Sequence, residues 1–477
     1  MQIVSAYLVT NLARRSCRLP RTKIAMLLVM LAACLTTGTA KCTAAPESGS
    51  PPNIVLILAD DLGHGDLSCY GQKQLKTPII DKMADEGMRF TRHYSGSTVC
   101  APSRCSLLTG MHTGHCTVRG NSGPGLKPED VTIPECLKKA GYATGIIGKW
   151  GVGAPRNLDN ANQHGFDYFY GYNSMWHAHN FYPAFLVRDG KKVPLRNVLP
   201  ERWANRSGEG VASEKIDYAP DLITAEALQF IERNKDKPFF LYFAMNVPHA
   251  NNEAGNRGME VPDHYEFADE DWPEPEKGFA AMIRNIDRDV GKVLDKLKEL
   301  GLDEKTLVIF TSDNGPHQEG GHKADFFDSN GPLRGKKRDL YEGGVRVPFI
   351  ARWPGKIEPG SESDHVSAFW DLLPTFCELA GVEAESKHDG ISMLPALLGK
   401  PGQRRHPFLY WEFGEQGGKV AVLKDDFKAV RLNTRKNPDG PVELYNIKED
   451  LGEQTDIAEK NPELVKELAE IMKQSHR

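Results

Sequence analysis

The first 365 residues of the chain alternate between continuous apolar runs and amphipathic segments. The apolar runs are Asn53–Ala59, Tyr142–Gly148, Pro238–Asn246 and Thr306–Ser312. Runs without polar alternation are typical of strands buried on both faces, as in a parallel sheet. The segments between them predict helices over 77–86, 132–141, 221–234 and 278–300, the first two with Thr77 and Thr132 as N-caps and Pro in the first turn. We therefore expect an α/β fold with a large, mostly parallel sheet flanked by helices on both faces.

The pattern changes after about residue 365. Shorter strand-like pieces follow at Phe408–Phe413, Val420–Leu423, Lys428–Leu432 and Val442–Tyr445. A last helix is expected from Pro462, capped by Asn461, with one apolar face made of Leu464, Val465, Leu468, Ile471 and Met472. We interpret this part as a small α+β subdomain over 365–477, after a larger domain over 53–364.

The N-terminal segment has the features of an export signal. Five basic residues precede the apolar run Ile24–Leu35, and residues 1–40 contain no acid. We expect 1–40 to be this signal and 41–52 a spacer, so that the protein is periplasmic, tethered to a membrane as a lipoprotein, or secreted. The run is too short to predict a transmembrane helix. Leu31–Cys34 resembles a bacterial lipobox, which makes a lipid anchor on Cys34 the alternative to plain cleavage near Ala40.

Composition and charge exclude some classes of function. The 477 residues are 40% hydrophobic and 26% charged, which is typical of a folded chain. Lys and Arg number 59 against 64 Asp and Glu, without a basic block, so nucleic acid is not an expected partner. The nine cysteines contain no metal-type Cys-x-x-Cys pair. Six of them follow the leader and allow disulfides, but a domain of this size does not depend on such bonds.

Polar residues follow four of the predicted strands directly. They are Asp60 and Asp61, Lys149, His249, and Asp313 with Asn314. In open α/β sheets ligands bind at the carboxyl ends of the strands, so one pocket is expected to collect these side chains. Three carboxylates and an amide suit a hard cation such as Ca²⁺ or Mg²⁺. Asp-Asp and Asp-Asn-Gly sequences are also common in plain turns, and spacing alone does not separate the two interpretations.

A second group centres on Cys100. The sequence Cys100-Ala-Pro-Ser-Arg104 predicts a loop that enters a short helix, with Pro in the first turn. A helix N-terminus offers free N–H groups to an anion and lowers the pKa of a thiol, and Arg104 lies about one turn further along. The alternative is a buried structural cysteine beside an ion-paired arginine.

Other basic residues are weaker candidates when each is taken alone. Lys149, His249, Lys336 and Lys337 could bind an anion or donate a proton, but single lysines and histidines more often have surface or structural roles. The placement of Lys149 and His249 at strand ends favours a role in the site. His177, His179 and His317 lie in Gly-rich or aromatic segments that could line a pocket.

The motifs resemble those of a known family. CAPSRCSLLTG at 100–110 resembles the first signature of the type I sulfatases, in the alkaline phosphatase superfamily, and GYATGIIGKW at 141–150 resembles the second. The family's other landmarks follow in order: ADDLGHGD at 59–66, Pro248-His249, SDNG at 312–315 and PLRGKKRDLYEGGVRVP at 332–348. The resemblance covers essentially the whole chain after the spacer. It implies an alkaline-phosphatase-like fold and the hydrolysis of sulfate monoesters.

The resemblance also implies roles for individual residues. Cys100 matches the cysteine that a maturation enzyme oxidises to formylglycine (3-oxoalanine), whose hydrate attacks the sulfate sulfur and forms a sulfated enzyme intermediate. The implied cation ligands are Asp60, Asp61, Asp313, Asn314 and the modified Cys100, with Ca²⁺ expected in preference to Mg²⁺. Arg104 and Lys149 match residues that hold the hydrate. His249 and Lys337 match groups on the sulfate and the leaving oxygen, one of them the general acid. Lys337 is preferred to Lys336 because it stands four residues before Tyr341, as in the family.

One position departs from the family pattern. Many members carry a histidine two residues after the signature lysine, and this chain has Gly151 there. The family pattern therefore does not identify the base that breaks down the intermediate. His112, His115 and His317 are alternatives for this role, and a further alternative is that turnover is slow.

The expected substrate is a sulfated carbohydrate rather than a simple aryl sulfate. The segment His177–Pro183 resembles loops of bacterial glycan sulfatases, and His177, His179 and His317 are the expected substrate contacts. One rival activity is that of a phosphodiesterase or phosphonate monoester hydrolase of the same superfamily. Another is a catalytically silent, lipid-tethered protein that binds glycans.

Overall fold

The structure is a computed structural model that describes residues 51–121, 123, 125–152, 157–204, 206–384 and 387–477. The expected export signal, Cys34 and nearly all of the spacer lie outside the described residues. Within the described ranges, none of the helices combines the length and the apolar character that crossing a membrane requires.

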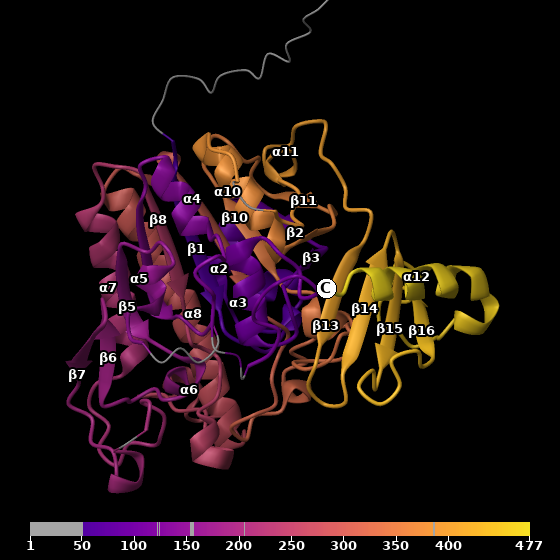
Figure 1. The fold of residues 1–477 in the computed structure, drawn as a ribbon. Helices are drawn as coiled ribbons and strands as arrows, with labels where there is room; N and C mark the ends of the chain where they lie inside the picture. The colour runs from indigo at the N-terminus through magenta and orange to yellow at the C-terminus, as the bar shows by residue number, and fades with distance from the viewer. Residues whose placement is uncertain (1–50, 122, 124, 153–156, 205, 385–386) are drawn as a thin grey trace, which may run out of the picture. The chain divides into compact units, whose positions relative to one another are not determined.

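A ten-stranded mixed sheet forms the centre of the fold (Figure 1). From edge to edge its strands are β11 (Ser361–Ser363), β2 (Met88–Phe90), β10 (Phe349–Arg352), β9 (Thr306–Ser312), β1 (Asn53–Ala59), β8 (Phe239–Ala244), β4 (Ala143–Lys149), β5 (Tyr168–Tyr172), β6 (Phe185–Arg188) and β7 (Lys191–Pro194). The five strands from β9 to β5 are all parallel. Antiparallel pairs join β10 to β9 and to β2 on one side and β5, β6 and β7 on the other. The predicted parallel sheet is thus confirmed for the central strands, and antiparallel strands extend it on both sides.

Strand β1 shows why the sequence pattern is continuous rather than alternating. Val55 and Ile57 point into one core, where they join residues of α7 and α8. Ile54 and Leu56 point into a second core, where they join residues of α3, α4 and α10. Each face of the sheet is therefore covered by helices, so both sets of alternate residues must be apolar.

The helices lie on these two faces. The first core contains residues of α2 (Pro78–Asp85), α7 (Ala219–Arg233) and α8 (Glu274–Glu299). The second core contains residues of α3 (Cys100–Thr109), α4 (Ile133–Lys139), α5 (Asn160–Gln163), α10 (Leu372–Ala380) and α11 (Leu394–Leu397). Two further short helices near the site are α6 (Met175–Ala178) and α9 (Glu342–Val345).

The two predicted threonine caps differ. Thr132 forms the expected capping box with Glu135, whose Oε2 accepts a hydrogen bond from the Thr132 backbone N–H at 2.8 Å. Thr77 occupies the N-cap position of α2, but its side chain does not cap the helix. Asp287 of α8 does so instead, since its Oδ1 accepts hydrogen bonds from the backbone N–H groups of Ile79 and Ile80 at 3.0 and 2.8 Å. A cap from a distant helix has no local sequence signal.

The C-terminal part forms a separate four-stranded antiparallel sheet. Its strands are β13 (Leu409–Phe413), β14 (Lys419–Lys424), β15 (Phe427–Leu432) and β16 (Val442–Asn446), and α12 (Pro462–Gln474) packs on one face (Figure 1). Leu468 and Met472 are the buried residues of the predicted apolar face of α12, and the rest of that face is partly buried. The other face of the sheet shares a core with the short pair β3 (His93–Tyr94) and β12 (Ser367–Ala368), in which Trp411 packs against Tyr94 and Trp370. These elements agree with the predicted α+β part, while its boundary at residue 365 stays a prediction.

Candidate active site

The parallel strands bring the predicted polar residues to one edge of the sheet. Strands β9, β1, β8 and β4 are neighbours, and all four run in the same direction. Hydrogen bonds continue beyond the strand ends, because the backbone N–H of Asp313 donates to Ala59 at 3.1 Å and that of Asp60 donates to Val247 at 3.0 Å. The residues after the four strands therefore stay aligned, and their side chains meet as predicted.

Three buried cations face three buried carboxylates at this edge. The Lys149 Nζ lies 2.7 Å from Asp60 Oδ2, and the Lys337 Nζ lies 2.8 Å from Asp61 Oδ2. The Arg104 guanidinium donates from Nη2 and Nε to Asp313 Oδ2 at 2.8 and 3.0 Å. All of these side chains are almost completely buried. Because isolated charges are not stable in such surroundings, each group depends on its partner.

The local charges lower the pKa of two of the carboxyl groups and leave that of the third raised. Burial alone would raise the pKa of Asp60 and of Asp61, but the facing cations, Lys149 for Asp60 and Lys337 for Asp61, hold both pKa values well below the usual range. Burial, together with the charge of Asp60, raises the pKa of Asp313 to about 7 in the absence of a bound ion. Of the three carboxylates, the charge of Asp313 is therefore the one that the surrounding protein stabilises least.

The oxygen atoms at this edge fit a hard divalent cation. Asn314 Oδ1 is buried without a hydrogen-bond partner, while its Nδ2 donates to Asp61 Oδ1 at 2.7 Å. Potential ligand atoms of Asp60, Cys100 and Asp313 lie within 4.8 Å of one another. Asp61 also adopts a left-handed backbone conformation with φ 67°, which is uncommon outside glycine and concentrates at functional sites. Plain turns would not explain this convergence from two strands, so the site suits a hard divalent cation, the class of ion expected from the sequence.

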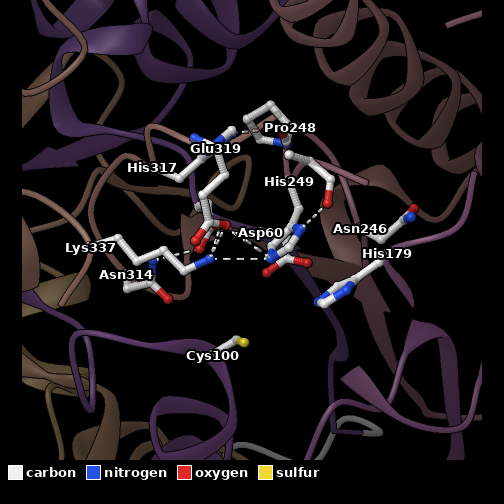
Figure 2. Close-up of polar contacts among 12 residues, drawn as sticks. Asp60, Cys100, His179, Asn246, Pro248, His249, Asn314, His317, Glu319 and Lys337 are labelled. Atoms are coloured by element: carbon white, nitrogen blue, oxygen red, sulfur yellow. Dashed lines mark hydrogen bonds and ion pairs between the residues drawn. The ribbon is translucent and has the colours of Figure 1, made fainter. Parts of the chain in front are cut away.

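Cys100 is the first residue of α3, as expected, and its thiol faces the same site. Figure 2 shows it across an open space from Lys337 and His249. Burial raises the pKa of the Cys100 thiol, which corrects the expectation that the helix N-terminus would lower it. An unmodified Cys100 is therefore not an activated thiolate nucleophile.

A cavity of about 150 Å³, enough for several water molecules, opens beside Cys100. Its lining includes four residues predicted from the sequence: Cys100, His179, His249 and Lys337. The other described residues that line it are Asn121, Met175, Trp176, Asn252, Arg338 and Glu415. In the described part of the chain, none of the six cysteines forms a disulfide bond.

Lys337 and His249 are hydrogen-bonded to each other at the cavity (Figure 2). The Lys337 Nζ donates to His249 Nε2 at 3.2 Å, and His249 Nδ1 donates to the Ala250 carbonyl at 2.7 Å. Burial lowers the pKa of His249 to about 3, with the Lys337 charge adding to the effect, so its imidazole is neutral. The pKa of Lys337 is raised because Asp61 and Glu319 outweigh its burial. Lys336 instead bonds to Gln318 at an exposed position, which supports the choice of Lys337.

The three expected substrate histidines have different positions. His179 lines the cavity, stacks on His249 with ring centroids 4.9 Å apart, and has its Nδ1 3.2 Å from Glu253 Oε1. His177 does not line it: the ring is completely buried, and its nitrogens contact the Phe185 carbonyl and the Asn173 N–H. His317 lies behind His249, with Nε2 donating to the Pro248 carbonyl and Nδ1 accepting from the Glu319 N–H. His177 and His317 therefore support the walls of the site rather than offer free atoms to a ligand.

Gly151, the departure from the family pattern, is required by the packing here. Its φ is 61°, and a Cβ atom would lie 2.9 Å from Lys149 Cε and 3.2 Å from Arg104 Cδ. A histidine at this position would therefore have a strained backbone and would press against the side chains of Lys149 and Arg104. His112 and His115, two of the alternatives, bind Asp389 instead and do not line the cavity. The histidines that line it, among the described residues, are His179 and His249.

Several residues of the site were not predicted from the sequence. Glu319 bonds to Lys337 at 2.9 Å, and Asn121, Trp176 and Glu415 line the cavity from three different segments. None stands at the end of a buried strand, so the pattern that located Asp60 and Asp313 did not apply. Of these residues, Glu319 alone lies close to a recognised motif, because it follows SDNG at 312–315 by four residues.

Comparison with known proteins agrees with this geometry. The family model described as Sulfatase matches residues 52–382, and the model for the C-terminal region of N-sulphoglucosamine sulphohydrolase matches 335–477. The N-acetylgalactosamine-6-sulfatase of Canis lupus familiaris is 35% identical over 76% of this chain and 68% of its own length. The N-acetylgalactosamine-6-O-sulfatase of Bacteroides thetaiotaomicron is 30% identical over 89% of this chain and 93% of its own.

A solved structure shows the same architecture. It belongs to the versatile locus with which Bacteroides thetaiotaomicron metabolises multiple glycosaminoglycans, and it is 27% identical to this chain. The two superpose with a TM-score of 0.73 over 90% of this chain and all of the other. With buried cations and carboxylates converging beside Cys100 at the end of the central sheet, the chain belongs to the type I sulfatase family and is a sulfatase.

Proposed function

We propose that this sulfatase hydrolyses sulfate monoesters of a carbohydrate, with Cys100 oxidised to formylglycine and with bound Ca²⁺. The single observation that carries the proposal is the convergence of Cys100 with Asp60 and Asp313, whose potential ligand atoms lie within 4.8 Å of one another. The raised pKa of the Cys100 thiol gives a reason for the modification, since the unmodified side chain is a poor nucleophile at neutral pH. The formylglycine hydrate would supply the attacking oxygen at this position.

The cation site is assigned to Asp60, Asp61, Asp313 and Asn314, with the modified Cys100 as a further ligand. The unpartnered Asn314 Oδ1 and the surplus of carboxylate oxygens support this assignment. When bound, Ca²⁺ supplies positive charge next to the sulfate oxygens and the attacking oxygen.

The protein's own residues do the rest of the positioning. Arg104 and Lys149 hold Asp313 and Asp60 in place, and their charges favour an anion beside Cys100. Lys337 stays protonated and lines the cavity, so it can donate a proton to the oxygen that leaves the sulfur. The neutral His249 accepts the Lys337 hydrogen bond and directs that proton. Sulfuryl transfer, like phosphoryl transfer, depends mainly on such positioning and charge stabilisation.

A carbohydrate substrate is favoured by the relatives and by the cavity. The two relatives named above act on a sulfated sugar according to their names. A further related structure, 27% identical with a TM-score of 0.74, is described in complex with a neocarrahexaose. The cavity contributes amide, carboxylate and indole groups, which together can bind hydroxyls and the apolar face of a sugar.

The proposal also includes the maturation of Cys100 and the location of the protein. A maturation enzyme that forms formylglycine is the required partner, and export to the periplasm, tethering through Cys34 or secretion is the expected location. The rival phosphonate monoester hydrolase shares the fold with a TM-score of 0.62. Sulfate-ester and phosphate-ester substrates assayed side by side separate that activity from the proposed one.

The decisive experiment is the mass of the tryptic peptide His93–Arg104, in which Cys100 is the sole cysteine. Protein produced with a formylglycine-forming enzyme should yield this peptide with a loss of about 18 Da, the change from thiol to aldehyde that creates the nucleophile. The neighbouring peptide Cys105–Arg119 is the internal control, since its two cysteines should keep their mass. Active enzyme with an unmodified thiol at position 100 would contradict the mechanism. Modified enzyme that binds sugars without releasing sulfate would instead support the silent glycan-binding alternative.

A further inference from the structure

One carboxylate at the cavity has no part in the proposed reaction. Glu415 lies in the turn between β13 and β14 and lines the same cavity as Cys100 and Lys337. Its Oε1 accepts a hydrogen bond from the Asn121 backbone N–H at 3.3 Å. Among the residues that the structure describes, the other oxygen, Oε2, has no hydrogen-bond partner and can bind a ligand.

The charge of Glu415 distinguishes it from the other acids around the cavity. Glu319 is paired with Lys337 at 2.9 Å and with Arg338 at 2.7 Å, and Glu253, which bonds to His179 Nδ1, does not line the cavity. Within the described ranges no lysine, arginine or histidine lies within 4.0 Å of the Glu415 carboxylate. A half-buried negative charge therefore stands at a cavity whose other end is built to hold an anion.

An unpaired carboxylate has two effects on a sulfated ligand. It accepts hydrogen bonds from hydroxyl groups, and it repels a second sulfate or a carboxylate on the same molecule. The neighbouring lining groups fit a neutral sugar ring, because Asn121 and Asn252 carry amides and the Trp176 indole is 43% exposed. An exposed indole at a cavity can cover the apolar face of a sugar ring.

We propose that Glu415 selects the charge of the substrate, accepting hydroxyl hydrogen bonds from the ring that carries the scissile sulfate and excluding a second anionic group beside it. The preferred substrate class is thus a monosulfated, otherwise neutral hexose or N-acetylhexosamine. This inference rests on the proposed function and deepens it. It also gives the C-terminal sheet a direct role in substrate choice, because the β13–β14 turn belongs to that sheet.

The test compares matched substrates in the mature enzyme with its full chain. N-acetylgalactosamine 6-sulfate and galactose 6-sulfate are each compared with a disulfated counterpart, and kcat/KM is measured for release of sulfate. We expect the wild type to favour the monosulfates by about tenfold or more. Glu415→Gln should lower kcat/KM on the monosulfates and raise it on the disulfates, so the two changes have opposite signs. Added salt should lower the ratio of kcat/KM on the monosulfates to kcat/KM on the disulfates. This ratio should fall more in the wild type than in Glu415→Gln, because salt screens the charge of Glu415.

Asp425→Asn is the matched control. Asp425 lies at the opposite, exposed end of the same sheet, and its left-handed backbone, φ 54°, is tolerated by Asn. This variant removes the same charge and should leave the preference unchanged. Equal use of both substrate types by the wild type, or a Glu415→Gln variant with an unchanged preference, would overturn the inference. Hydrolysis of 4-nitrophenyl sulfate without hydrolysis of any sugar monosulfate would also overturn it while the sulfatase activity stands. Failure on every sulfate ester, by contrast, would contradict the proposed function itself.

Discussion

The Arg104 Nη2 lies 2.8 Å from Asp313 Oδ2, and both side chains are completely buried. The second oxygen of the same carboxylate, Oδ1, accepts a hydrogen bond from the backbone N–H of Asp61 at 3.0 Å. Asp313 is thus fixed by a residue of α3 and by the second residue after β1. This arrangement connects the helix that begins at Cys100 to the carboxylates proposed to hold the cation.

The first prediction concerns Asp313→Asn. The substitution keeps the shape of the side chain but removes the negative charge of a proposed cation ligand. It leaves Arg104 with the longer contact to Asp60 Oδ1 at 3.5 Å. We expect loss of sulfatase activity together with loss of the rise in Tm that Ca²⁺ produces in the wild type. The unfolding free energy should also fall by about 3 kcal/mol, because the buried Arg104 loses the shorter of its two ion pairs.

Asp289→Asn is the control for this prediction. Asp289 is a similarly buried carboxylate on α8 that pairs with Arg288 and Lys292, away from the cavity. Its replacement should leave the Ca²⁺-dependent rise in Tm intact even if stability falls. If Asp313→Asn retained full activity and its response to Ca²⁺, Asp313 would not belong to the cation site.

The second prediction concerns Lys428→Met. The Lys428 Nζ lies 2.8 Å from Glu342 Oε1, and both side chains are fully buried. Glu342 begins α9, shortly after Lys337, and its backbone N–H donates to Glu453 at 2.7 Å. The C-terminal sheet therefore holds the segment that carries Lys337. Removing Lys428 should lower the unfolding free energy by about 3 kcal/mol, because the buried Glu342 then keeps Arg346, at 3.3 Å, as its remaining charged partner among the described residues.

The same variant should also lower kcat, since the segment that positions Lys337 loses an anchor. Lys424→Met provides the matched control, because Lys424 forms only a partly exposed pair with Glu467 on the same sheet. Exposed pairs contribute about 1 kcal/mol or less. Denaturant titrations and steady-state kinetics of the two variants give the comparison, and equal effects of both substitutions would argue against the anchoring role of Lys428.

Much of this architecture was predictable because its signals are local. Strands β1 and β9 have the predicted limits, since burial on both faces makes the whole strand apolar and the polar residues that follow mark its end. The same signal located Asp60, Lys149 and Asp313. The antiparallel edge strands β6 and β7 were not predicted, because they are short and partly exposed and lack a continuous apolar run.

The contacts that were missed are those between distant segments. The Asp287 cap of α2 joins residues 208 positions apart in the chain, and the Glu319 contact with Lys337 joins two loops. Glu415 reaches the cavity only because the C-terminal sheet packs against the part of the chain that contains Asn121. Such contacts depend on tertiary packing, which the spacing of residues does not encode directly. The sign of the Cys100 pKa shift was also wrong from sequence, since burial outweighs the effect of the helix N-terminus.

The third prediction is a dependence of stability on pH through His93. His93 is completely buried against Phe349 and Phe369, and burial lowers its pKa from 6.5 to about 3. Below pH 6.5 the unfolded chain binds a proton at this histidine that the folded chain does not bind. The contribution of His93 to the unfolding free energy is therefore fully present above pH 6.5 and declines by about 1.4 kcal/mol per pH unit as the pH falls toward 3.

His93→Phe is the variant that isolates this effect. It keeps an aromatic ring among the two phenylalanines and removes the titrating group, so stability should change less steeply between pH 6.5 and 4 than in the wild type. The comparison uses the slope of unfolding free energy against pH, which is independent of any constant loss from the His93 contact with Ser367. Parallel curves for the two proteins would show that His93 is protonated in the folded state.

The fourth prediction concerns the base that Gly151 cannot supply. His179 lines the cavity, and its Nδ1 is held by Glu253, which leaves Nε2 as the free ring nitrogen. We expect His179→Asn to lower kcat by about 100-fold, the usual scale for loss of a general base. The first turnover should be less affected, so that rapid mixing shows an early burst of alcohol product followed by slow release of sulfate.

The control for this variant is His115→Asn, because His115 was an alternative for the same role and binds Asp389 instead. It should leave both the burst and the steady-state rate close to those of the wild type. His249, the other histidine on the cavity, accepts a hydrogen bond from Lys337, so its loss should slow the first turnover as well. The two histidines are therefore separated by which phase of the reaction slows. A His179→Asn variant with an unchanged steady-state rate would place the base elsewhere, and a variant whose burst disappears would place His179 in the first step, with His249.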